Sequence, residues 1–565
     1  MKKKYLVVGG VAGGASAAAR LRRLDESAEI IMFEKGPDVS FSNCALPYFL
    51  GGVIENSEDL VIMHPEEFKN MFNIDARTKQ EVLSIDKEKK TVTVKKLTDG
   101  STYEESYDDL ILSPGAAPVV PKSIGGWDRD NVFTVRNVVD IKKLNDYIKE
   151  NNIKKIAVIG GGFIGIEVME NLREAGKEVA LIEALDQVMM PFDYEMAQIL
   201  HKEIYDNGVN LILGDSLKEV KDGKVILSSG KEVMADAVVM AIGVRPETSL
   251  ATEAGLEIGE TGAIKVDNNF RTSDPHIYAV GDAIEVHSFI TKKPTRLALA
   301  GPAQRQARTV ANRIYGKFGS NKGVIGSSIV RVFGMNAAST GLNEKTLIKE
   351  GITYDYAFII PKDKVGIMPD ASPLFFKLLF EKPSGRILGA QAIGKGSADK
   401  RIDVIATIIS MDGTLEDLKE LELTYSPIYS TARDVVNIAA LVGLNILNGV
   451  YKQVPISKTR ELVESGAFII DARPKDMYEL GHLKTSINIP IGEFRNRLSE
   501  IPKDKPVYIH CRSSQNSYFV LTALQQLGYT NITNISGSFL GISVFEYFND
   551  KTTDREPILT EYNFD

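Results

Sequence analysis

A glycine-rich turn between an apolar strand and a helix constrains the fold of the first part of this chain. The turn is residues 9–14 (GGVAGG), which follow the apolar residues 5–8, precede a helix expected at 15–24 and lead on to a strand ending at Glu34. Glycines let the backbone approach a pyrophosphate, the helix N-terminus stabilises its charge, and the acid binds ribose hydroxyls. The layout predicts a dinucleotide-binding unit, although Val11 replaces the usual middle glycine.

A second unit of the same kind begins with residues 155–159 and the turn 160–165 (GGGFIG), before a helix and a strand ending at Glu183. Two such units predict two bound dinucleotides. Glu183 stands where an acid bonds the ribose 2′-hydroxyl and repels a 2′-phosphate, which predicts NADH rather than NADPH; an ordinary surface acid is the alternative. The contacts expected from the two turns are Gly9, Gly10, Gly13, Gly14, Glu34, Gly160, Gly162, Gly165 and Glu183.

The composition limits the kind of protein. A chain of 565 residues is long enough for about three or four domains. With 67 Lys and Arg against 75 Asp and Glu it has no basic footprint for nucleic acid. Only two cysteines are present, which excludes a disulfide framework and predicts a cytoplasmic location. The basic start is not interpreted as a signal peptide, because glycines break the apolar run that follows, and no segment predicts a membrane span.

Cys44 is one of the two cysteines and lies in the stretch 40–48 (SFSNCALPY), just beyond the first nucleotide-binding unit. It has no partner at the spacing of a dithiol or of a metal site, and no metal is expected. A lone thiol in this place predicts a nucleophile that alternates between thiolate and a mixed disulfide with a substrate thiol. The alternative is a buried cysteine that only fills space.

Three further segments, 110–116, 240–246 and 272–282, occur in an order that resembles the flavoprotein disulfide reductases. The resemblance implies FAD in the first unit and NADH in the second, with Asp282 holding the flavin's ribityl chain. It also implies cofactor contacts at Lys35, Gly115, Gly243, Gly281 and Ala300. The implied domains are 1–115 and 243–322 for FAD, 116–242 for NADH and 323–445 for dimerisation, followed by a linker at 446–455 and a further domain at 456–565.

Within that group, the stretch 40–48 and residues 423–427 (LTYSP) resemble coenzyme A disulfide reductase across residues 1–445. The resemblance implies a homodimer in which Cys44 pairs with the coenzyme A thiol and Tyr425 reaches the site from the other subunit. The implied coenzyme A contacts are Arg20, Arg23, Ser40, Asn43 and Arg433. A solvated helix face is the alternative for the two arginines at residues 20 and 23.

Met368 departs from this family, which often has a tyrosine there. A thioether cannot protonate a departing thiolate, so weaker activity on the symmetric disulfide is expected. A persulfide is less affected because it expels hydrosulfide, a better leaving group. NADH peroxidases and oxidases are the nearest alternative, but they typically carry a histidine in the first glycine turn, where this chain has Ala12.

Residues 456–565 resemble a rhodanese domain, with an acid-x-arginine at 471–473, a glycine-histidine at 481–482 and a cysteine loop at 511–516. Strand, cysteine, tight loop and helix together stabilise an anionic sulfur, so Cys511 is expected to carry a persulfide. Asn516 stands where many rhodanese loops have an arginine, which favours a neutral or organic sulfur donor over thiosulfate. The alternative is a degenerate domain used only for interactions.

The sequence therefore predicts an α/β protein with two dinucleotide-binding domains, an α+β dimerisation domain and an α/β rhodanese domain. The fusion predicts an NADH-dependent reductase of coenzyme A persulfide and related small persulfides or disulfides, acting through Cys44, with sulfur handled at Cys511. Two other functions stay open. One is a peroxide or oxygen reductase; the other is a sulfurtransferase or sulfur sensor whose flavin domain is a scaffold.

Overall fold

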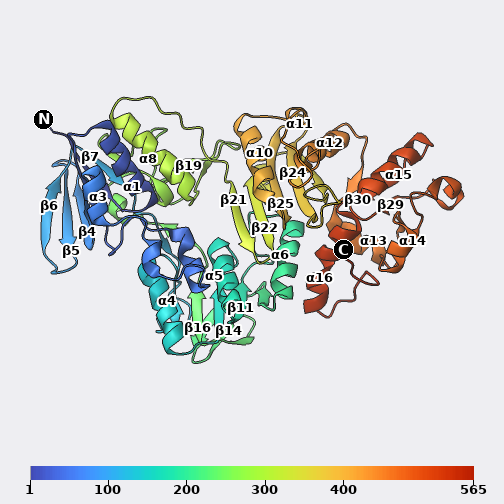
Figure 1. The fold of residues 1–565 in the computed structure, drawn as a ribbon, viewed down its shortest axis with the longest axis horizontal. Helices are drawn as coiled ribbons and strands as arrows, with labels where there is room; N and C mark the ends of the chain where they lie inside the picture. The colour runs from blue at the N-terminus through green and yellow to red at the C-terminus, as the bar shows by residue number, and fades with distance from the viewer. Residues whose placement is uncertain (1, 565) are drawn as a thin grey trace. The chain divides into compact units, whose positions relative to one another are not determined.

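The computed structural model describes residues 2–564, which divide into two compact units. The first comprises the chain up to Ala184 together with Gly214–Val324, and the second comprises Leu185–Leu213 together with the chain from Ile325 onward. Strands and helices alternate through much of both units (Figure 1). Among the described residues, no helix is both long and apolar enough to cross a membrane.

The first unit contains a parallel sheet with the strand order β18-β7-β1-β2-β3. β1 (Lys4–Val8) lies between β2 (Glu29–Phe33) and β7 (Asp109–Leu112). The middle residues of β1 are at most 2% exposed, because both faces of a parallel sheet are covered. The outer strands are β3 (Asp75–Arg77) and β18 (Ile277–Ala279), so a segment far along the chain returns to the first sheet.

Helix α1 (Ala12–Leu24) begins inside the glycine turn, earlier than the sequence pattern predicts. The early start places Gly14 in the first turn of the helix, where a Cβ would lie 1.8 Å from the carbonyl oxygen of Gly9, so only glycine fits. α1 packs against α8 (Ala300–Ile314). Strand β2 ends at Phe33, so Glu34 stands one residue beyond the strand.

A second set of parallel strands is centred on β10 (Lys155–Ile159). As β1 does in the first sheet, β10 lies between two parallel strands, β11 (Glu178–Glu183) and β16 (Ala237–Met240). β9 (Val132–Phe133) pairs with β16, and α5 (Phe163–Glu174) follows the second glycine turn. The remaining elements of the first unit are α2 (Leu46–Leu50), α3 (Pro65–Phe72), β4 (Gln80–Asp86), β5 (Thr91–Lys96), β6 (Thr102–Ser106), β8 (Ala116–Pro118), α4 (Val138–Glu150), β13 (Leu217–Lys221), β14 (Lys224–Leu227), β15 (Glu232–Met234), β17 (Val244–Pro246), α7 (Ser249–Glu253), β19 (Val286–His287) and β20 (Pro294–Thr295).

The second unit contains an antiparallel sheet with the order β21-β22-β25-β24-β23. Its inner strands β24 (Leu374–Glu381) and β25 (Ile387–Gly394) are buried almost throughout, and the nearly all-apolar α12 (Val435–Leu447) packs on this sheet. The other elements of this part are β12 (Asn210–Leu213), β21 (Ser328–Val332), β22 (Met335–Gly341), α9 (Glu344–Glu350), β23 (Tyr354–Ile359), α10 (Ala398–Ser410) and α11 (Leu415–Lys419).

The same unit continues into a five-stranded parallel sheet with the order β26-β30-β29-β27-β28. Its first strand, β26 (Gln453–Val454), comes from the segment that the sequence suggests is a linker. The other elements are α13 (Thr459–Glu464), β27 (Phe468–Asp471), α14 (Lys475–Glu479), β28 (Ser486–Asn488), β29 (Val507–His510), α15 (Gln515–Gln526), β30 (Ile532–Ile535) and α16 (Ser538–Thr552).

Helix α6 (Tyr194–Asp206) packs against α16 in the second unit. Tyr194 meets Phe545 edge to face at a ring-centroid distance of 5.8 Å, and His201 meets Phe548 at 5.3 Å. Complete burial lowers the pKa of His201 to about 3, so this imidazole is neutral and serves packing.

Candidate active site

The first glycine turn is held to the end of β2 by one carboxylate. Glu34 accepts hydrogen bonds from the backbone N–H groups of Gly10 (3.0 Å) and Gly36 (2.8 Å). Gly9 has a φ of +97°, and a Cβ there would lie 2.0 Å from the carbonyl oxygen of Ser113, so only glycine fits. No side chain caps α1, which leaves its first N–H groups for an anion. The turn fits a dinucleotide pyrophosphate.

The second glycine turn repeats this construction. Glu183 accepts a hydrogen bond from the N–H of Gly161 (2.6 Å), and Gly160 has a φ of +106°. A Cβ on Gly162 would meet no atom within 4 Å, whereas one on Gly165 would lie 1.8 Å from the carbonyl oxygen of Gly160. The open space at Gly162, at the uncapped start of α5, fits the second dinucleotide.

The other predicted cofactor residues of the first unit lie near the ends of its strands and helices. Asp282 lies in a 3-10 turn after β18, and burial raises its pKa. Gly281 donates its N–H to Gln306 (2.8 Å). The remaining positions are Lys35, which is exposed, Gly115 and Gly243, which have φ values of +73° and +115° with no neighbour where a Cβ would stand, and Ala300, the first residue of α8.

Cys44 lies in a 3-10 turn (Asn43–Ala45) immediately before α2, and its side chain is exposed. Burial by its neighbours raises the pKa of the thiol, and the charges of Glu167 and Asp282 raise it further. The chain therefore presents an accessible thiol whose nearest charges are carboxylates. These charges disfavour the thiolate that the chemistry needs.

Glu167 on α5 is a site residue that the sequence analysis missed. Burial raises the pKa of its carboxyl to about 7, with a smaller contribution from Glu170. The group is therefore half protonated near neutral pH, within electrostatic reach of Cys44. Its position directly after the second glycine turn was visible in the sequence, but only the packing of α2 against α5 brings it near the thiol.

The predicted coenzyme A residues of the first unit differ in their surroundings. Arg20 donates two hydrogen bonds to Asn312 (2.9 and 2.7 Å), and Arg23 is exposed. Ser40 has a left-handed φ of +50°, and exposed Asn43 donates to the carbonyl oxygen of Arg136 (3.3 Å). These side chains remain within reach of solvent and of a ligand.

Arg22 shows the contrast with its neighbours at residues 20 and 23. It is buried and donates hydrogen bonds to four backbone carbonyl oxygens, so its role is structural.

Tyr425 and Arg433 belong to the second unit, in the irregular segment between α11 and α12. Tyr425 is 49% exposed, and the same segment exposes Ile428 and Tyr429. Arg433 is exposed as well, so an apolar and cationic loop faces outward from this unit. Met368 lies in another irregular segment of the unit and is partly exposed.

Cys511 follows β29 directly and lies at the head of α15. The residue is only 2% exposed. Its N–H donates to Ser538 (3.3 Å), and the Ser517 hydroxyl lies 3.6 Å from its sulfur. Ser514, at the N-cap of α15, has a left-handed φ of +73°, which closes the loop tightly around the thiol. Asn516 lies in the first turn of that helix.

The predicted acid-x-arginine pair, Asp471 and Arg473, lies in the domain core next to this loop. Asp471 and Arg473 are both buried and form an ion pair at 2.6 Å, while the Arg473 guanidinium lies 3.6 Å from the ring centroid of Phe539. His510, fully buried beside Cys511, has its pKa lowered mainly by burial and is neutral. The pair and the histidine are therefore buried groups of the domain core next to the cysteine loop.

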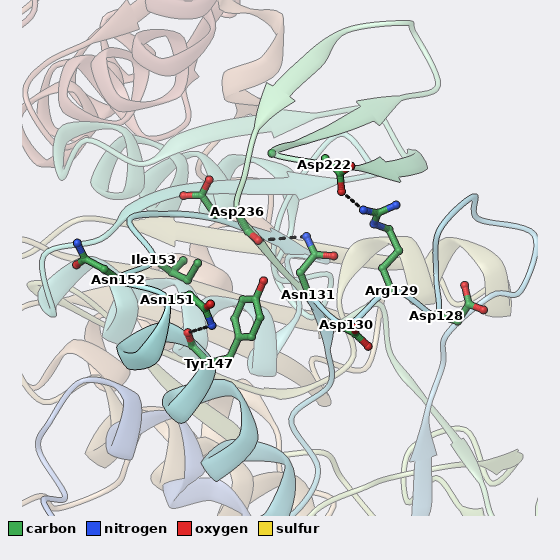
Figure 2. A pocket seen from close by; sticks show the side chains of 11 residues that line it. Asp128, Arg129, Asp130, Asn131, Tyr147, Asn151, Asn152, Ile153, Asp222 and Asp236 are labelled. Carbon is green, nitrogen blue, oxygen red and sulfur yellow. Dashed lines mark hydrogen bonds and ion pairs between the residues drawn. The ribbon is translucent and has the colours of Figure 1, made fainter.

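A hollow of about 640 Å³ in the first unit contains none of the predicted site residues. Figure 2 shows its lining residues, among which Arg129 pairs with Asp222 and Asn131 donates to the backbone carbonyl oxygen of Asp236 (3.1 Å). Its lining is largely polar and includes four aspartates, Asp128, Asp130, Asp222 and Asp236. The hollow is therefore separate from the thiol chemistry.

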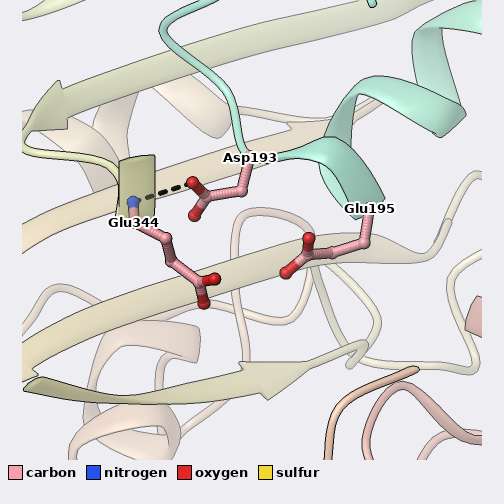
Figure 3. A group of neighbouring side chains, drawn as sticks. All are labelled: Asp193, Glu195 and Glu344. Atoms are coloured by element: carbon pink, nitrogen blue, oxygen red, sulfur yellow. Dashed lines mark hydrogen bonds between the residues drawn. The ribbon is translucent and has the colours of Figure 1, made fainter. Parts of the chain in front are cut away.

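Three carboxylates in the second unit, Asp193, Glu195 and Glu344, gather as a metal site would (Figure 3). The ammonium group of fully buried Lys377 lies 2.8, 2.5 and 2.7 Å from their oxygens. A cation of the chain itself thus already occupies the centre of the trio. The cluster ties the start of α6 to β24.

Family models match three consecutive parts of the chain. Residues 3–307 match the pyridine nucleotide-disulphide oxidoreductase model, residues 327–435 match the dimerisation domain of the same proteins, and residues 456–544 match the rhodanese-like domain. These matches confirm the predicted fold class.

Similar proteins of the same kind are known. Coenzyme A disulfide reductase of Staphylococcus epidermidis is 36% identical over 77% of this chain and 98% of its own length. The crystal structure of reduced Bacillus anthracis CoADR-RHD has a TM-score of 0.94 at 45% identity, covering 97% of this chain and 98% of the other. An NAD-dependent persulfide reductase from A. fulgidus has a TM-score of 0.91 at 34% identity, covering 96% and 100%.

These proteins confirm the resemblance seen in the sequence, and FAD and NADH are the cofactors that fit the two glycine turns. The chain belongs to the pyridine nucleotide-disulphide oxidoreductase family and carries a rhodanese-like domain after its dimerisation domain.

Proposed function

We propose that this protein uses NADH to reduce persulfides of low-molecular-weight thiols, coenzyme A persulfide above all, and more slowly the corresponding disulfides. The observation that carries the proposal is the placement of the only two cysteines, Cys44 and Cys511, one in each of two sulfur-handling domains. Relatives named as a coenzyme A disulfide reductase and a persulfide reductase support the same chemistry.

The Cys44 thiolate attacks the inner sulfur of the persulfide RS–SH. The S–S bond breaks, hydrosulfide leaves, and a Cys44–S–S–R mixed disulfide forms. Two electrons and one proton then return the mixed disulfide to the Cys44 thiolate and RSH. The sum is NADH, H⁺ and RSSH going to NAD⁺, RSH and H₂S. FAD, when bound, supplies the two-electron relay between NADH and the mixed disulfide.

Glu167 accepts the proton that leaves the Cys44 thiol. A group with a pKa of about 7 exchanges protons most readily near neutral pH. The same carboxylate, once charged, raises the pKa of Cys44, so the two groups hold one proton between them. The phosphates of coenzyme A meet the cationic side chains of Arg20 and Arg23.

The active protein is a homodimer in the cytoplasm. The exposed loop that carries Tyr425 and Arg433 reaches the site of the other subunit, where the phenol protonates the departing coenzyme A thiolate. Met368 supplies no second proton donor, which is why the symmetric disulfide is the poorer substrate. Cys511 exchanges sulfane sulfur with the thiol of coenzyme A.

The test is anaerobic NADH oxidation by the purified holoenzyme with coenzyme A persulfide, coenzyme A disulfide or hydrogen peroxide in turn. We expect the persulfide to be turned over fastest, with one sulfide released for each NADH, and no turnover in Cys44→Ser. A higher efficiency with the disulfide would contradict the substrate order. Preference for peroxide would contradict the proposed function.

A further inference from the structure

Arg401, near the start of α10, is a buried arginine that joins two separate loops of the dimerisation domain. The residue is 1% exposed. Its Nε and Nη2 lie 3.4 and 3.1 Å from the two carboxylate oxygens of Asp434, and Nη2 also donates to the carbonyl oxygen of Asp363 (2.8 Å). Its Nη1 donates to the carbonyl oxygen (3.0 Å) and the hydroxyl (2.8 Å) of Ser397. These five hydrogen bonds match the five N–H groups of an arginine.

Asp363 lies at the base of the loop that carries Met368, residues 361–373, which we call the Met368 segment. Asp363 is buried, its N–H donates to the carbonyl oxygen of Ser372 (2.9 Å), and its carboxylate accepts the N–H of Ser372 (2.8 Å). Further out, Met368 is partly exposed and Ile367 is 82% exposed. The Met368 segment therefore has a closed, buried base and an open tip, and Arg401 holds it at the base.

Asp434 ends the loop that carries Tyr425 and Arg433, residues 424–434, which we call the Tyr425 segment. Asp434 is buried, and its side chain accepts the N–H of Val436 (3.3 Å) as the N-cap of α12. It is thus fixed to a nearly all-apolar helix that packs on the central sheet. Tyr425 and Arg433 are exposed on the same loop. The Tyr425 segment therefore resembles the Met368 segment in having a buried anchor and an exposed working part.

The contribution of Arg401 is geometric rather than a gain in stability. A buried ion pair adds little over apolar packing, because both charges lose their hydration. A planar guanidinium, however, directs its donors at fixed angles and meets a carboxylate with two hydrogen bonds in one plane. Because one such group bonds both Asp434 and Asp363, it sets the distance and the orientation between the anchors of the two segments.

We propose that Arg401 is a positioning residue: its guanidinium holds the Met368 segment and the Tyr425 segment in one arrangement and so places the Tyr425 hydroxyl for proton transfer to the departing thiolate. Arg401 itself is buried too deeply to touch a substrate. Because Met368 offers a thioether and no proton, Tyr425 is the donor that depends on this placement. The inference rests on the proposed role of Tyr425 and deepens it.

The first measurement is amide hydrogen exchange of the full-length holoenzyme without NADH and without persulfide. Arg401→Lys keeps the charge but offers three donors in place of five, so we expect exchange at residues 363–372 and 426–433 to speed up together, at least about fivefold. The matched control is Arg460→Lys, which makes the same change where Arg460 pairs with buried Glu546 and Asp550. This control should leave both segments unchanged. Bound flavin and circular dichroism check that each variant is folded.

Asp434→Asn tests the same contact from its other side and does not depend on the folding of Arg401→Lys. Asparagine caps a helix about as well as aspartate, so α12 keeps its N-cap. The pair with Arg401 loses its negative charge and one strong acceptor. Exchange should again rise in both segments, by a smaller factor than in Arg401→Lys.

The second measurement is a double-mutant cycle on kcat with coenzyme A persulfide. We expect Tyr425→Phe to lower kcat about a hundredfold through loss of the proton donor, and Arg401→Lys to lower it about tenfold through its misplacement. The double variant should match Tyr425→Phe alone, because no hydroxyl remains to be misplaced. Arg460→Lys should leave kcat unchanged in either background. The cycle is repeated with Asp434→Asn in place of Arg401→Lys.

Exchange that is unchanged, or raised in only one segment, in both Arg401→Lys and Asp434→Asn overturns the joining of the two segments. A double variant about tenfold slower than Tyr425→Phe overturns the placement of the phenol, because independent effects multiply. Either result overturns the proposal. A wild type that turned over no sulfur substrate would instead contradict the proposed function. The exchange comparison would still decide whether Arg401 joins the segments, so the two failures are distinguishable.

Discussion

The two cysteines of this chain have opposite surroundings. Cys44 is exposed on a short turn and is faced by two carboxylates that raise its pKa. Cys511 is 2% exposed, at the head of the twelve-residue helix α15 and among hydroxyl groups. Because neighbouring carboxylates disfavour its thiolate, the accessible Cys44 thiol reacts when a substrate or a proton acceptor binds beside it. A covered thiol with built-in donors can hold a reactive sulfur between encounters.

The largest effect that distinguishes the two thiols comes from removing each in turn. Cys44→Ser should lower NADH oxidation with coenzyme A persulfide by at least about a thousandfold, because the nucleophile is lost. Cys511→Ser should leave turnover of preformed coenzyme A persulfide within about threefold of the wild type, because the covered thiol takes no part in hydride-driven cleavage. The check is steady-state NADH oxidation with sulfide release. Equal losses in both variants would mean that the two sites act as one.

The protection of Cys511 depends on the buried pair beneath its loop. Arg473→Met leaves the Asp471 carboxylate buried without its partner, and we expect a loss of about 3–5 kcal/mol of local stability. Hydrogen exchange at residues 507–510 measures this loss. The matched control is Arg497→Met, which breaks partly exposed ion pairs to Glu493 and Glu500 and should cost at most about 1 kcal/mol. Similar exchange in the two variants would show that the pair does not support the loop.

The effect of the Glu167 charge on the pKa of Cys44 is tested with Glu167→Gln. The background is Cys511→Ser, in which Cys44 is the only thiol. Above pH 7 the Glu167 carboxylate is charged and raises the pKa of Cys44. Its removal should therefore lower that pKa and speed alkylation at pH 7–8 severalfold, while the part of the shift that burial causes remains. Glu174→Gln, an exposed position on the same helix, should change neither. A higher thiol pKa in Glu167→Gln would contradict the sign.

Glu167 also makes folding pH-dependent. Folding raises the pKa of its carboxyl from the ordinary value of 4.5 to about 7, so the folded state favours the protonated form. Its contribution to stability is present below pH 4.5 and falls as the pH rises to 7. Glu167→Gln should lack this loss. Thermal unfolding of the two proteins at pH 5 and pH 8 should therefore diverge with rising pH, and parallel curves would contradict the raised pKa.

The smallest effect is expected at Ser517. Because its proton is held by Asn534, Ser517→Ala should change the alkylation rate of Cys511 at pH 7 by less than about threefold. The measurement is the rate of iodoacetamide alkylation of the full-length Cys44→Ser protein, in which Cys511 is the remaining thiol. A tenfold loss would show that the Ser517 proton goes to the sulfur rather than to Asn534.

The sequence predicted the features whose residues are contiguous. Both glycine turns, with Glu34 and Glu183, occur within short segments, and so does the strand and cysteine loop of the rhodanese-like domain. Glu167 was missed because only the packing of α2 on α5 brings it to Cys44. Lys377 forms ion pairs with three carboxylates from two distant segments, which no local pattern reveals. Strand β26 lies in a segment whose composition suggested only a linker.

The roles of the predicted coenzyme A contacts, and of Tyr425 and Arg433, stay predictions. Their exposure shows that they are available to a ligand or a partner, and sequence similarity suggested them where charge alone favoured a solvated face. Arg22 shows how such a pattern misleads, because the arginine between two expected contacts is committed to backbone carbonyls.

The position of strand β26 decides where the rhodanese-like domain has to begin if it is to fold alone. The rhodanese-like family match begins at residue 456, yet β26 pairs with β30 from residues 453–454. A fragment that begins at residue 456 would expose the edge of β30, while one that ends at residue 544 would lose most of α16. The structural domain is thus longer than the family match, and a fragment meant to fold alone has to begin before β26 and continue through α16.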